Sequence, residues 1–171
     1  MFKKFYPNMR VKSVFHIDYK GLYKKGYRGI IFDLDNTLVH HGDDSNEKVD
    51  RLFKDIHNIG LKTVILSDNT DERIQRFLKN IDTSYVSDAE KPNPKGYQKA
   101  LQLLGTKKEE TICVGDQIFT DIYGANNAGL KSILVDFIRE PNVKKIGKKR
   151  RVEQIILKFY KLNRHYKNAN I

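Results

Sequence analysis

The stretch GIIFDLDNTL at residues 29–38 joins a short apolar run to two acidic side chains. Residues 29–33 form a short, mainly apolar run that predicts a buried β-strand. Side chains two residues apart in an extended chain point to the same side, so Asp33 and Asp35 are expected to face one site. The stretch therefore predicts a strand that ends in a pair of carboxylates.

Strands and helices alternate along the chain after this first strand. One helix is expected to begin at a capping box, with Asp44 as N-cap and Glu47 three residues later, and to end at Gly60. Strands separated by helices predict an α/β fold, a three-layer, Rossmann-like parallel sheet with helices on both faces. Further strands are expected at residues 62–66, 85–86, 112–115 and 132–135, and further helices at 70–80, 94–104 and 119–128.

More polar residues follow the other predicted strands. Ser67 and Asp68 come directly after one strand, and Asp116 comes after another. Ligands bind at the carboxyl ends of parallel strands, so these residues are expected to lie near Asp33 and Asp35. Adjacent carboxylates repel each other unless a cation is present, and Mg²⁺ binds oxygen ligands that include one or two carboxylates. The pattern predicts a magnesium site.

The same side chains favour phosphoryl transfer. The Asp33 carboxylate can attack phosphorus and form an aspartyl-phosphate. Asp35 can protonate the leaving alcohol and then activate the water that releases phosphate. Lys91, which lies in the sequence EKPNP, supplies a cation, and the Ser67 hydroxyl can donate a hydrogen bond to the phosphoryl group.

Four short motifs occur in order over residues 33–121. They are DLDNTL at 33–38, Ser67 after an apolar strand, Lys91 before Pro92, and GDQIFTD at 115–121. In this order the motifs resemble those of the haloacid dehalogenase (HAD) superfamily. The resemblance implies a HAD-like fold, Mg²⁺ as cofactor and a phosphatase that hydrolyses phosphomonoesters.

The resemblance also implies roles for individual residues. Asp33 would be the nucleophile and Asp35 the acid and base, and Ser67 and Lys91 would bind the phosphoryl group. The residues expected to contact the substrate are Thr37, Ser67, Asp68, Asn69 and Lys91.

For the metal, the resemblance implies ligation by the Asp33 side chain, the backbone carbonyl of Asp35 and the side chain of Asp116. Asp121 would orient Lys91 or a metal-bound water. A second interpretation of Asn69 remains open, in which it caps the helix expected at residue 70. The adjacent His40 and His41 either line the entrance to the site or are plain loop residues, and the second interpretation is favoured because an adjacent pair cannot easily bind one metal.

The spaces between the motifs are short. Residues 39–61 and 68–90 are each largely taken up by one predicted helix, with a short strand in the second, so neither can hold a cap domain. A site without a cap is open, which suits large substrates or substrates presented on a surface.

A finer resemblance covers roughly residues 7–137. The chain is similar to the small bacterial enzymes of HAD subfamily IIIA and to the mitochondrial phosphatidylglycerophosphatase. This implies removal of the terminal phosphate of phosphatidylglycerophosphate, a phospholipid. Asp68 departs from the pattern of that group, in which Asn is expected after the motif-two serine.

Charge is distributed unevenly along the chain. The net charge is +11, with +7 in residues 1–29 and +9 in residues 139–171, which leaves −5 for residues 30–138. We therefore expect a basic lead-in packed on or beside the core (1–28), an acidic catalytic core (29–138) and a basic tail (139–171). Basic ends suit an anionic surface, either lipid or nucleic acid, but they also serve solubility alone.

The tail has the pattern of an amphipathic helix. Apolar residues recur at helical spacing among basic ones, and such a helix either lies on an anionic membrane or packs on the domain. The apolar positions are Val152, Ile155, Ile156, Phe159 and Leu162, and the basic ones Lys158, Lys161, Arg164 and Lys167.

Two other functions remain possible on the sequence alone. One is a soluble phosphatase for nucleotides or other small phosphates, and the other is an RNA-binding or assembly protein that uses the basic ends. The sequence contains no aromatic RNP motif, which disfavours nucleic acid as a partner. No signal peptide or membrane-spanning segment is evident, so we expect a cytoplasmic protein that can associate peripherally with the membrane. The sequence makes no prediction of the oligomeric state.

Overall fold

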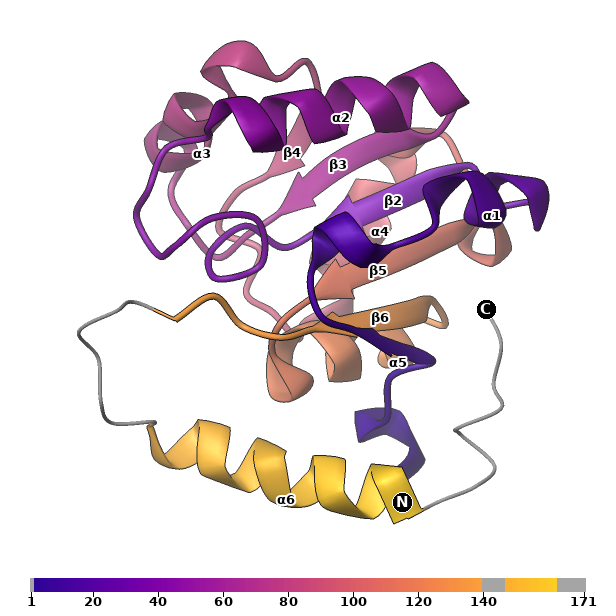
Figure 1. Cartoon of the computed structure of the whole chain (residues 1–171), viewed down its shortest axis with the longest axis vertical. Helices are drawn as coiled ribbons and strands as arrows, with labels where there is room; N and C mark the ends of the chain where they lie inside the picture. The colour runs from indigo at the N-terminus through magenta and orange to yellow at the C-terminus, as the bar shows by residue number, and fades with distance from the viewer. Residues whose placement is uncertain (1, 140–146, 163–171) are drawn as a thin grey trace.

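The computed structural model describes residues 2–139 and 147–162 (Figure 1). The predicted tail positions Arg164 and Lys167 lie outside the described residues, and side chains are described as far as Tyr160.

A six-stranded parallel sheet forms the centre of the fold, in the order β1-β6-β5-β2-β3-β4. The expected parallel α/β sheet is therefore confirmed, since every strand pair in it is parallel. Its strands are β1 (Met9–Val11), β2 (Gly29–Phe32), β3 (Lys62–Leu66), β4 (Ser84–Val86), β5 (Thr111–Gly115) and β6 (Lys131–Val135).

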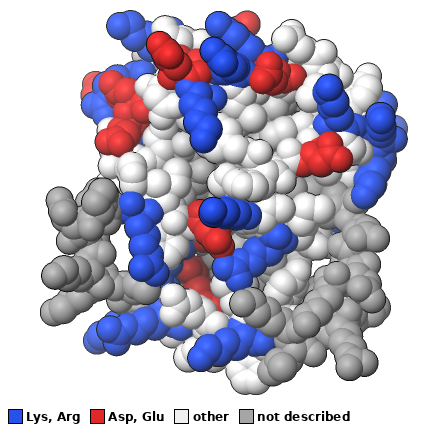
Figure 2. All heavy atoms as spheres, in the orientation of Figure 1, with Lys and Arg blue, Asp and Glu red and all other residues white. Residues whose placement is uncertain are grey.

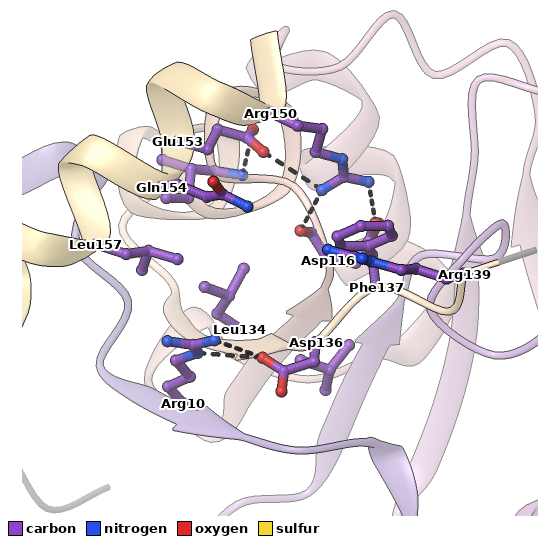
Figure 3. Close-up of a pocket in the computed structure, with 12 residues that line it drawn as sticks. Arg10, Asp116, Leu134, Asp136, Phe137, Arg139, Arg150, Glu153, Gln154 and Leu157 are labelled. Carbon is purple, nitrogen blue, oxygen red and sulfur yellow. Dashed lines mark hydrogen bonds and ion pairs between the residues drawn. The ribbon is translucent and has the colours of Figure 1, made fainter. Parts of the chain in front are cut away.

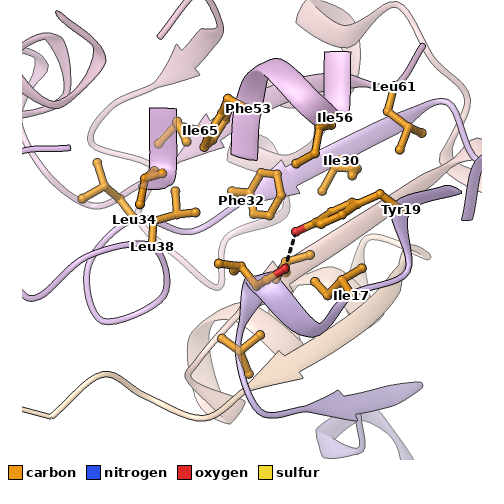
Figure 4. Close-up of a cluster of buried hydrophobic side chains, with 14 of the residues drawn as sticks. Ile17, Tyr19, Ile30, Phe32, Leu34, Leu38, Phe53, Ile56, Leu61 and Ile65 are labelled. Atoms are coloured by element: carbon orange, nitrogen blue, oxygen red, sulfur yellow. Dashed lines mark hydrogen bonds between the residues drawn. The ribbon is translucent and has the colours of Figure 1, made fainter. Parts of the chain in front are cut away.

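The edge strand β1 comes from the lead-in, before the predicted start of the core at residue 29. It pairs with β6 over the register Met9 to Ile133. The segment after it is also anchored, because the Tyr19 hydroxyl donates a hydrogen bond to the carbonyl of Val14 at 2.8 Å within the apolar core (Figure 4). The sheet and its core therefore extend into residues 1–28.

Helices cover both faces of the sheet. The buried cluster that contains Phe32 and Phe53 joins the sheet to α1, α2 and α3, and a second cluster around Tyr97 joins it to α4 and α5. This gives the expected three layers (Figure 1). The helices are α1 (Tyr19–Lys24), α2 (Glu47–Ile59), α3 (Asp71–Phe77), α4 (Pro94–Leu104), α5 (Tyr123–Asn127) and α6 (Lys148–Leu162). Short 3₁₀ turns lie at Phe2–Phe5, Val14–His16, Leu78–Asn80 and Lys108–Glu110, and a π-helical turn lies at Ile118–Ile122.

The start of α2 differs from the prediction. Asn46, not Asp44, is the N-cap, because its side-chain oxygen accepts hydrogen bonds from the amides of Lys48 and Val49, both at 3.1 Å. The Asp44 side chain instead pairs with Arg76 at 2.5 Å. Gly60 ends the helix with a positive φ of 98°, as expected for a residue without a Cβ.

The connections near the sheet edge hold no separate cap domain. Residues 33–93 are all described, and apart from β3 and β4 they contain only α2, α3 and the 3₁₀ turn that follows α3. The carboxyl ends of the strands are therefore not enclosed by an inserted domain.

Helix α6 packs on the domain with one side only. Ile156 and Leu157 contact a small cluster formed by Ile118, Ile122 and Leu134. Val152, Ile155 and Phe159 stay exposed at 47%, 52% and 60%. The predicted stripe thus divides into a packed side and an exposed side, and none of the described helices is long and apolar enough to cross a bilayer.

Surface charge differs between the two ends of the view in Figure 2. Basic and acidic side chains mix over α2 and α3 at the top, whereas Lys and Arg lie along the lower edge, where α6 runs.

Candidate active site

The ends of β2 and β5 bring two predicted carboxylates together. The Asp33 amide donates to the carbonyl of Val114 at 2.9 Å, which continues the ladder between these strands to the point where Asp116 follows. Carboxylate oxygens of Asp33, Asp116 and Asp121 lie within 4.8 Å of one another. All three residues are buried, so the acidic cluster lies inside the protein at the carboxyl ends of the strands.

Lys91 is the cation of this cluster. Its Nζ donates to Asp33 Oδ1 at 2.5 Å and to Asp121 Oδ1 at 2.8 Å. Asp121 is held in turn by the Gln117 amide, which donates to Asp121 Oδ2 at 2.9 Å. Gly115 makes this arrangement possible, because a Cβ there would lie 2.4 Å from the Asp121 side chain.

Thr37 lies between the two strand-end carboxylates. Its hydroxyl is 2.7 Å from Asp33 Oδ2 and 3.2 Å from Asp116 Oδ1. Thr37 therefore braces the cluster in the structure, and its predicted contact with substrate stays a prediction.

Ser67 and Asn69 lie side by side after β3. Asn69 donates to the Ser67 hydroxyl from its backbone amide at 3.2 Å and from its side-chain Nδ2 at 2.8 Å. Because Asn69 is the donor in both contacts, the Ser67 hydroxyl proton remains available for an acceptor. The capping interpretation of Asn69 is wrong, since Thr70 is the N-cap of α3.

Asp35 contacts a separate group of hydrogen-bond donors. Its Oδ2 lies 2.9 Å from Asn69 Nδ2 and 2.9 Å from His41 Nδ1. Its Oδ1 accepts from Arg73 Nη2 at 3.1 Å. Arg73 was not predicted from the sequence, whereas His41 was considered both as a plain loop residue and as one that lines the entrance to the site.

Asp68 supports the backbone of the Lys91 loop. Its Oδ1 accepts a hydrogen bond from the Lys91 amide at 2.8 Å, and the residue is otherwise exposed. The Asp68 carboxylate therefore positions the loop that carries Lys91, and its predicted contact with substrate stays a prediction.

Burial and mutual repulsion make the negative charges of the cluster costly. Burial raises the pKa of Asp33 to about 6, with Lys91 acting against the shift. Burial and the neighbouring Asp33 and Asp121 raise the pKa of Asp116 to about 8. Burial alone would lower the pKa of Lys91, but Asp121 and Asp33 outweigh it and raise that pKa well above its ordinary range. The site therefore favours additional positive charge.

The carboxylate oxygens of Asp33, Asp116 and Asp121 suit a hard divalent cation such as Mg²⁺, which prefers oxygen ligands. The side chain that completes the cluster with Asp33 and Asp116 is Asp121, while the Asp35 side chain has the other partners described above. The implied ligation by the Asp35 backbone carbonyl stays a prediction.

A second cation reaches the cluster from helix α6. Arg150 forms an ion pair with Asp116 Oδ2 and also donates to the Asp116 carbonyl at 2.7 Å (Figure 3). Glu153, one turn later, is 4% exposed and accepts from the amides of Ile118 and Phe119 at 2.9 and 3.2 Å. The tail therefore contacts a residue of the site as well as packing on the domain.

Sequence comparisons place the chain among known hydrolases. The family model described as haloacid dehalogenase-like hydrolase matches residues 43–129, a range that contains Ser67, Lys91 and Asp116. A protein named Probable phosphatase YqeG, from Bacillus subtilis, is 35% identical over 137 residues, which cover 79% of this chain and 80% of the relative. Pyrophosphatase PpaX from Halalkalibacterium halodurans is 38% identical over 100 residues, which cover 53% of this chain and 46% of the relative.

A solved structure supports the fold. The crystal structure of a protein from Listeria monocytogenes serotype 4b has a TM-score of 0.55 and is 20% identical in sequence. The match covers 80% of this chain and 99% of that chain. At this level of identity the likeness concerns the fold alone.

Proposed function

This chain belongs to the haloacid dehalogenase-like hydrolase family, and from this premise we propose that it hydrolyses phosphomonoesters through a phosphoryl group carried on Asp33. The observation that carries the proposal is the buried lysine that joins two carboxylates. Lys91 Nζ lies 2.5 Å from Asp33 and 2.8 Å from Asp121, at the carboxyl edge of a parallel sheet. A relative that covers most of the chain is named a phosphatase, which agrees with this chemistry.

The reaction has two steps. Asp33 attacks phosphorus, the bond from phosphorus to the alcohol oxygen breaks, and Asp35 gives its proton to the leaving oxygen. Water then attacks the phosphorus of the aspartyl-phosphate, Asp35 takes the proton from the water, and phosphate leaves with the Asp33 carboxylate restored. Ser67 and Lys91 donate to the phosphoryl oxygens during both steps.

A bound Mg²⁺ would be held by Asp33 and Asp116 and would neutralise charge on the phosphoryl oxygens. Thr37 keeps the two carboxylates in register, because its hydroxyl contacts both. Asp121 accepts from the same Lys91 ammonium group as Asp33 and so helps to hold it in place.

The test is phosphate release from a panel of monoesters by the wild type and Asp33→Asn, with Mg²⁺ and with excess chelator. We expect Asp33→Asn to lose activity on every ester while it stays folded, because an amide has nearly the same shape but is a poor nucleophile. Asp55→Asn is the matched control, since Asp55 is an exposed residue on α2. Turnover by Asp33→Asn at the wild-type level would refute the assignment.

For the substrate, we propose the phosphate of a lipid head group, with phosphatidylglycerophosphate as the specific candidate. Support comes from the site without a cap domain and from the exposed apolar side of α6. That side borders an apolar groove of about 480 Å³, lined by Phe5, Tyr6, Phe119, Val152, Ile155, Ile156 and Phe159. Basic residues beside an apolar face favour an anionic membrane surface, where each contributes about 1 kcal/mol.

The membrane part of the proposal is tested by the double variant Ile155→Ser with Phe159→Ser. Both side chains are more than half exposed, so the packed side of α6, with Arg150 and Glu153, is unchanged. We expect weaker co-sedimentation with anionic vesicles and unchanged turnover of a soluble ester. Leu103→Ser is the control, because Leu103 is 46% exposed on the distant helix α4. Vesicle binding by the double variant equal to that of the wild type would favour the soluble phosphatase for small phosphates.

A further inference from the structure

A cavity of about 340 Å³ lies next to Asp116 of the acidic cluster, between α6 and the end of β6 (Figure 3). Guanidinium groups from three separate parts of the chain line it. Arg10 comes from β1, Arg139 from the segment after β6, and Arg150 from α6. We call this space the arginine cavity.

The cavity begins where the acidic cluster ends. Asp116 belongs to both, since its Oδ1 faces the Thr37 hydroxyl at 3.2 Å and its Oδ2 pairs with Arg150. Thr37 in turn contacts Asp33. The Thr37 hydroxyl and the Asp116 carboxylate, both buried, thus link the nucleophile to Arg150, and the cavity borders the acidic cluster through Asp116.

The three arginines differ in how far their charge is already paired. Arg10 pairs with Asp136 at 2.6 Å, and Arg150 pairs with Asp116 and, at 3.3 Å, with Glu153. Arg139 forms no ion pair with any residue in the described ranges 2–139 and 147–162. Its guanidinium lies 5.1 Å from the centre of the Phe137 ring, a contact made through the face of the guanidinium, and its edge donors have no ion-pair partner among the described residues.

The lining also holds three carboxylates, Asp116, Asp136 and Glu153, so its formal charge is balanced in the structure. Glu153 accepts from the amides of Ile118 and Phe119 with one oxygen and pairs with Arg150 through the other. A cation bound by Asp116 would satisfy that carboxylate and leave donors of Arg150 for another acceptor. The charge then available at the cavity suits an anion, and guanidinium groups bind phosphate through paired hydrogen bonds.

We propose that the arginine cavity binds a second phosphate of the substrate while the phosphate to be removed lies at Asp33. The preferred substrate is therefore a phosphomonoester linked through a short polyol to another phosphate. This inference rests on the proposed phosphatase function and deepens it. The second phosphate can be the diester of a lipid head group or the second ester of a soluble bisphosphate, and the two sources are distinguishable.

The experiment compares kcat/KM for three substrates: short-chain phosphatidylglycerophosphate, glycerol bisphosphate and p-nitrophenyl phosphate. The variants are Arg139→Gln and, as a matched charge control, Arg51→Gln on the exposed side of α2. We expect Arg139→Gln to lower the preference for two-phosphate over one-phosphate substrates about tenfold, which corresponds to about 1.4 kcal/mol. Arg51→Gln should keep the wild-type preference.

The two-phosphate substrate whose kcat/KM falls in Arg139→Gln identifies the source of the second phosphate. A fall for the lipid alone means that the cavity binds a phosphodiester, and a fall for glycerol bisphosphate as well means that it binds phosphate in general. If kcat/KM falls for neither, the proposal is overturned. Arg150→Lys is the second variant, because it keeps the charge beside Asp116 but removes the paired donors of guanidinium. It too should lower the preference.

A binding measurement keeps this inference separate from the proposed function. Calorimetric titration of Asp33→Asn with glycerol bisphosphate, in the presence of Mg²⁺, needs no turnover. We expect Arg139→Gln in the same background to bind about tenfold more weakly. Equal affinities would overturn the arginine cavity even if the enzyme is a phosphatase. Absence of hydrolysis by the wild type, together with weaker binding by the arginine variant, would instead refute the catalytic proposal alone.

Discussion

Replacing Glu153 with Gln should loosen helix α6 from the active site. The Glu153 side chain is 5% exposed, and one of its oxygens accepts from the amides of Ile118 and Phe119 at 2.9 and 3.2 Å. The other oxygen lies 3.3 Å from Arg150. Gln keeps one carbonyl oxygen for the amides, but it loses the charge and turns an NH₂ group toward Arg150.

The magnitude follows from these contacts. A hydrogen bond to a charged group contributes about 1.5–3 kcal/mol, and the amide oxygen of Gln retains part of this. Breaking a buried ion pair costs about 3–5 kcal/mol, but Arg150 keeps Asp116 as its partner, so only part of that cost applies. We therefore expect a loss of about 2–3 kcal/mol in the docking of α6.

The assay is hydrogen exchange at the amides of Ile118 and Phe119. A loss of about 2–3 kcal/mol speeds their exchange by about 30- to 150-fold, provided that undocking of α6 exposes them. Glu109→Gln is the control, because the Glu109 side chain is 67% exposed. This variant should leave hydrogen exchange at the amides of Ile118 and Phe119 unchanged. Unchanged exchange at both amides in Glu153→Gln would refute the idea that this carboxylate holds α6 on the domain.

Three further predictions concern the acidic cluster. Mg²⁺ at about 100 times its dissociation constant should raise the free energy of unfolding by about 2.7 kcal/mol. Ca²⁺ should inhibit turnover, because its larger and irregular coordination shell can engage both oxygens of Asp33. Full activity in excess chelator would contradict the metal site. Without metal, the free energy of unfolding should fall by a few kcal/mol as pH rises from about 4 to about 8. The reason is that Asp33 and Asp116, whose pKa values are raised in the folded protein, keep protons there that the unfolded chain has already lost. Equal stabilities in urea titrations at pH 5 and pH 8 would contradict this prediction. Gly115→Ala should destabilise the protein by about 1–3 kcal/mol in thermal melts, since its Cβ would lie 2.4 Å from Asp121, and a wild-type melting temperature would show that Asp121 can move aside.

The sequence predicted those parts of the site that follow directly from strands. Asp33 and Asp116 meet because β2 and β5 are neighbours in a parallel sheet, and the apolar runs before them were clear. Strand β1 was missed because three residues carry too little periodicity to define a strand. The N-cap of α2 was misplaced because Asp44 and Asn46 are both good caps, and only the tertiary contact of Asp44 with Arg76 separates them.

The residues that came from outside the motifs could not be predicted. Arg73 reaches Asp35 from α3, and Arg150 reaches Asp116 from a helix 34 positions later in the chain. Both contacts depend on how helices dock on the sheet, which local patterns do not encode. The pattern of the tail predicted only a basic amphipathic helix, and it assigned no role to Arg150 or Glu153.

The proposed mechanism depends most on a covalent bond between phosphate and Asp33. The measurement is a rapid acid quench of wild-type protein during turnover with Mg²⁺, followed by borohydride reduction and mass spectrometry of the peptide that contains residues 29–38. An aspartyl-phosphate at Asp33 is reduced to homoserine, so we expect homoserine at position 33 in the wild type and none without substrate. Homoserine at Asp35 in place of Asp33, or steady turnover with no modified peptide at any quench time, would contradict the proposed nucleophile.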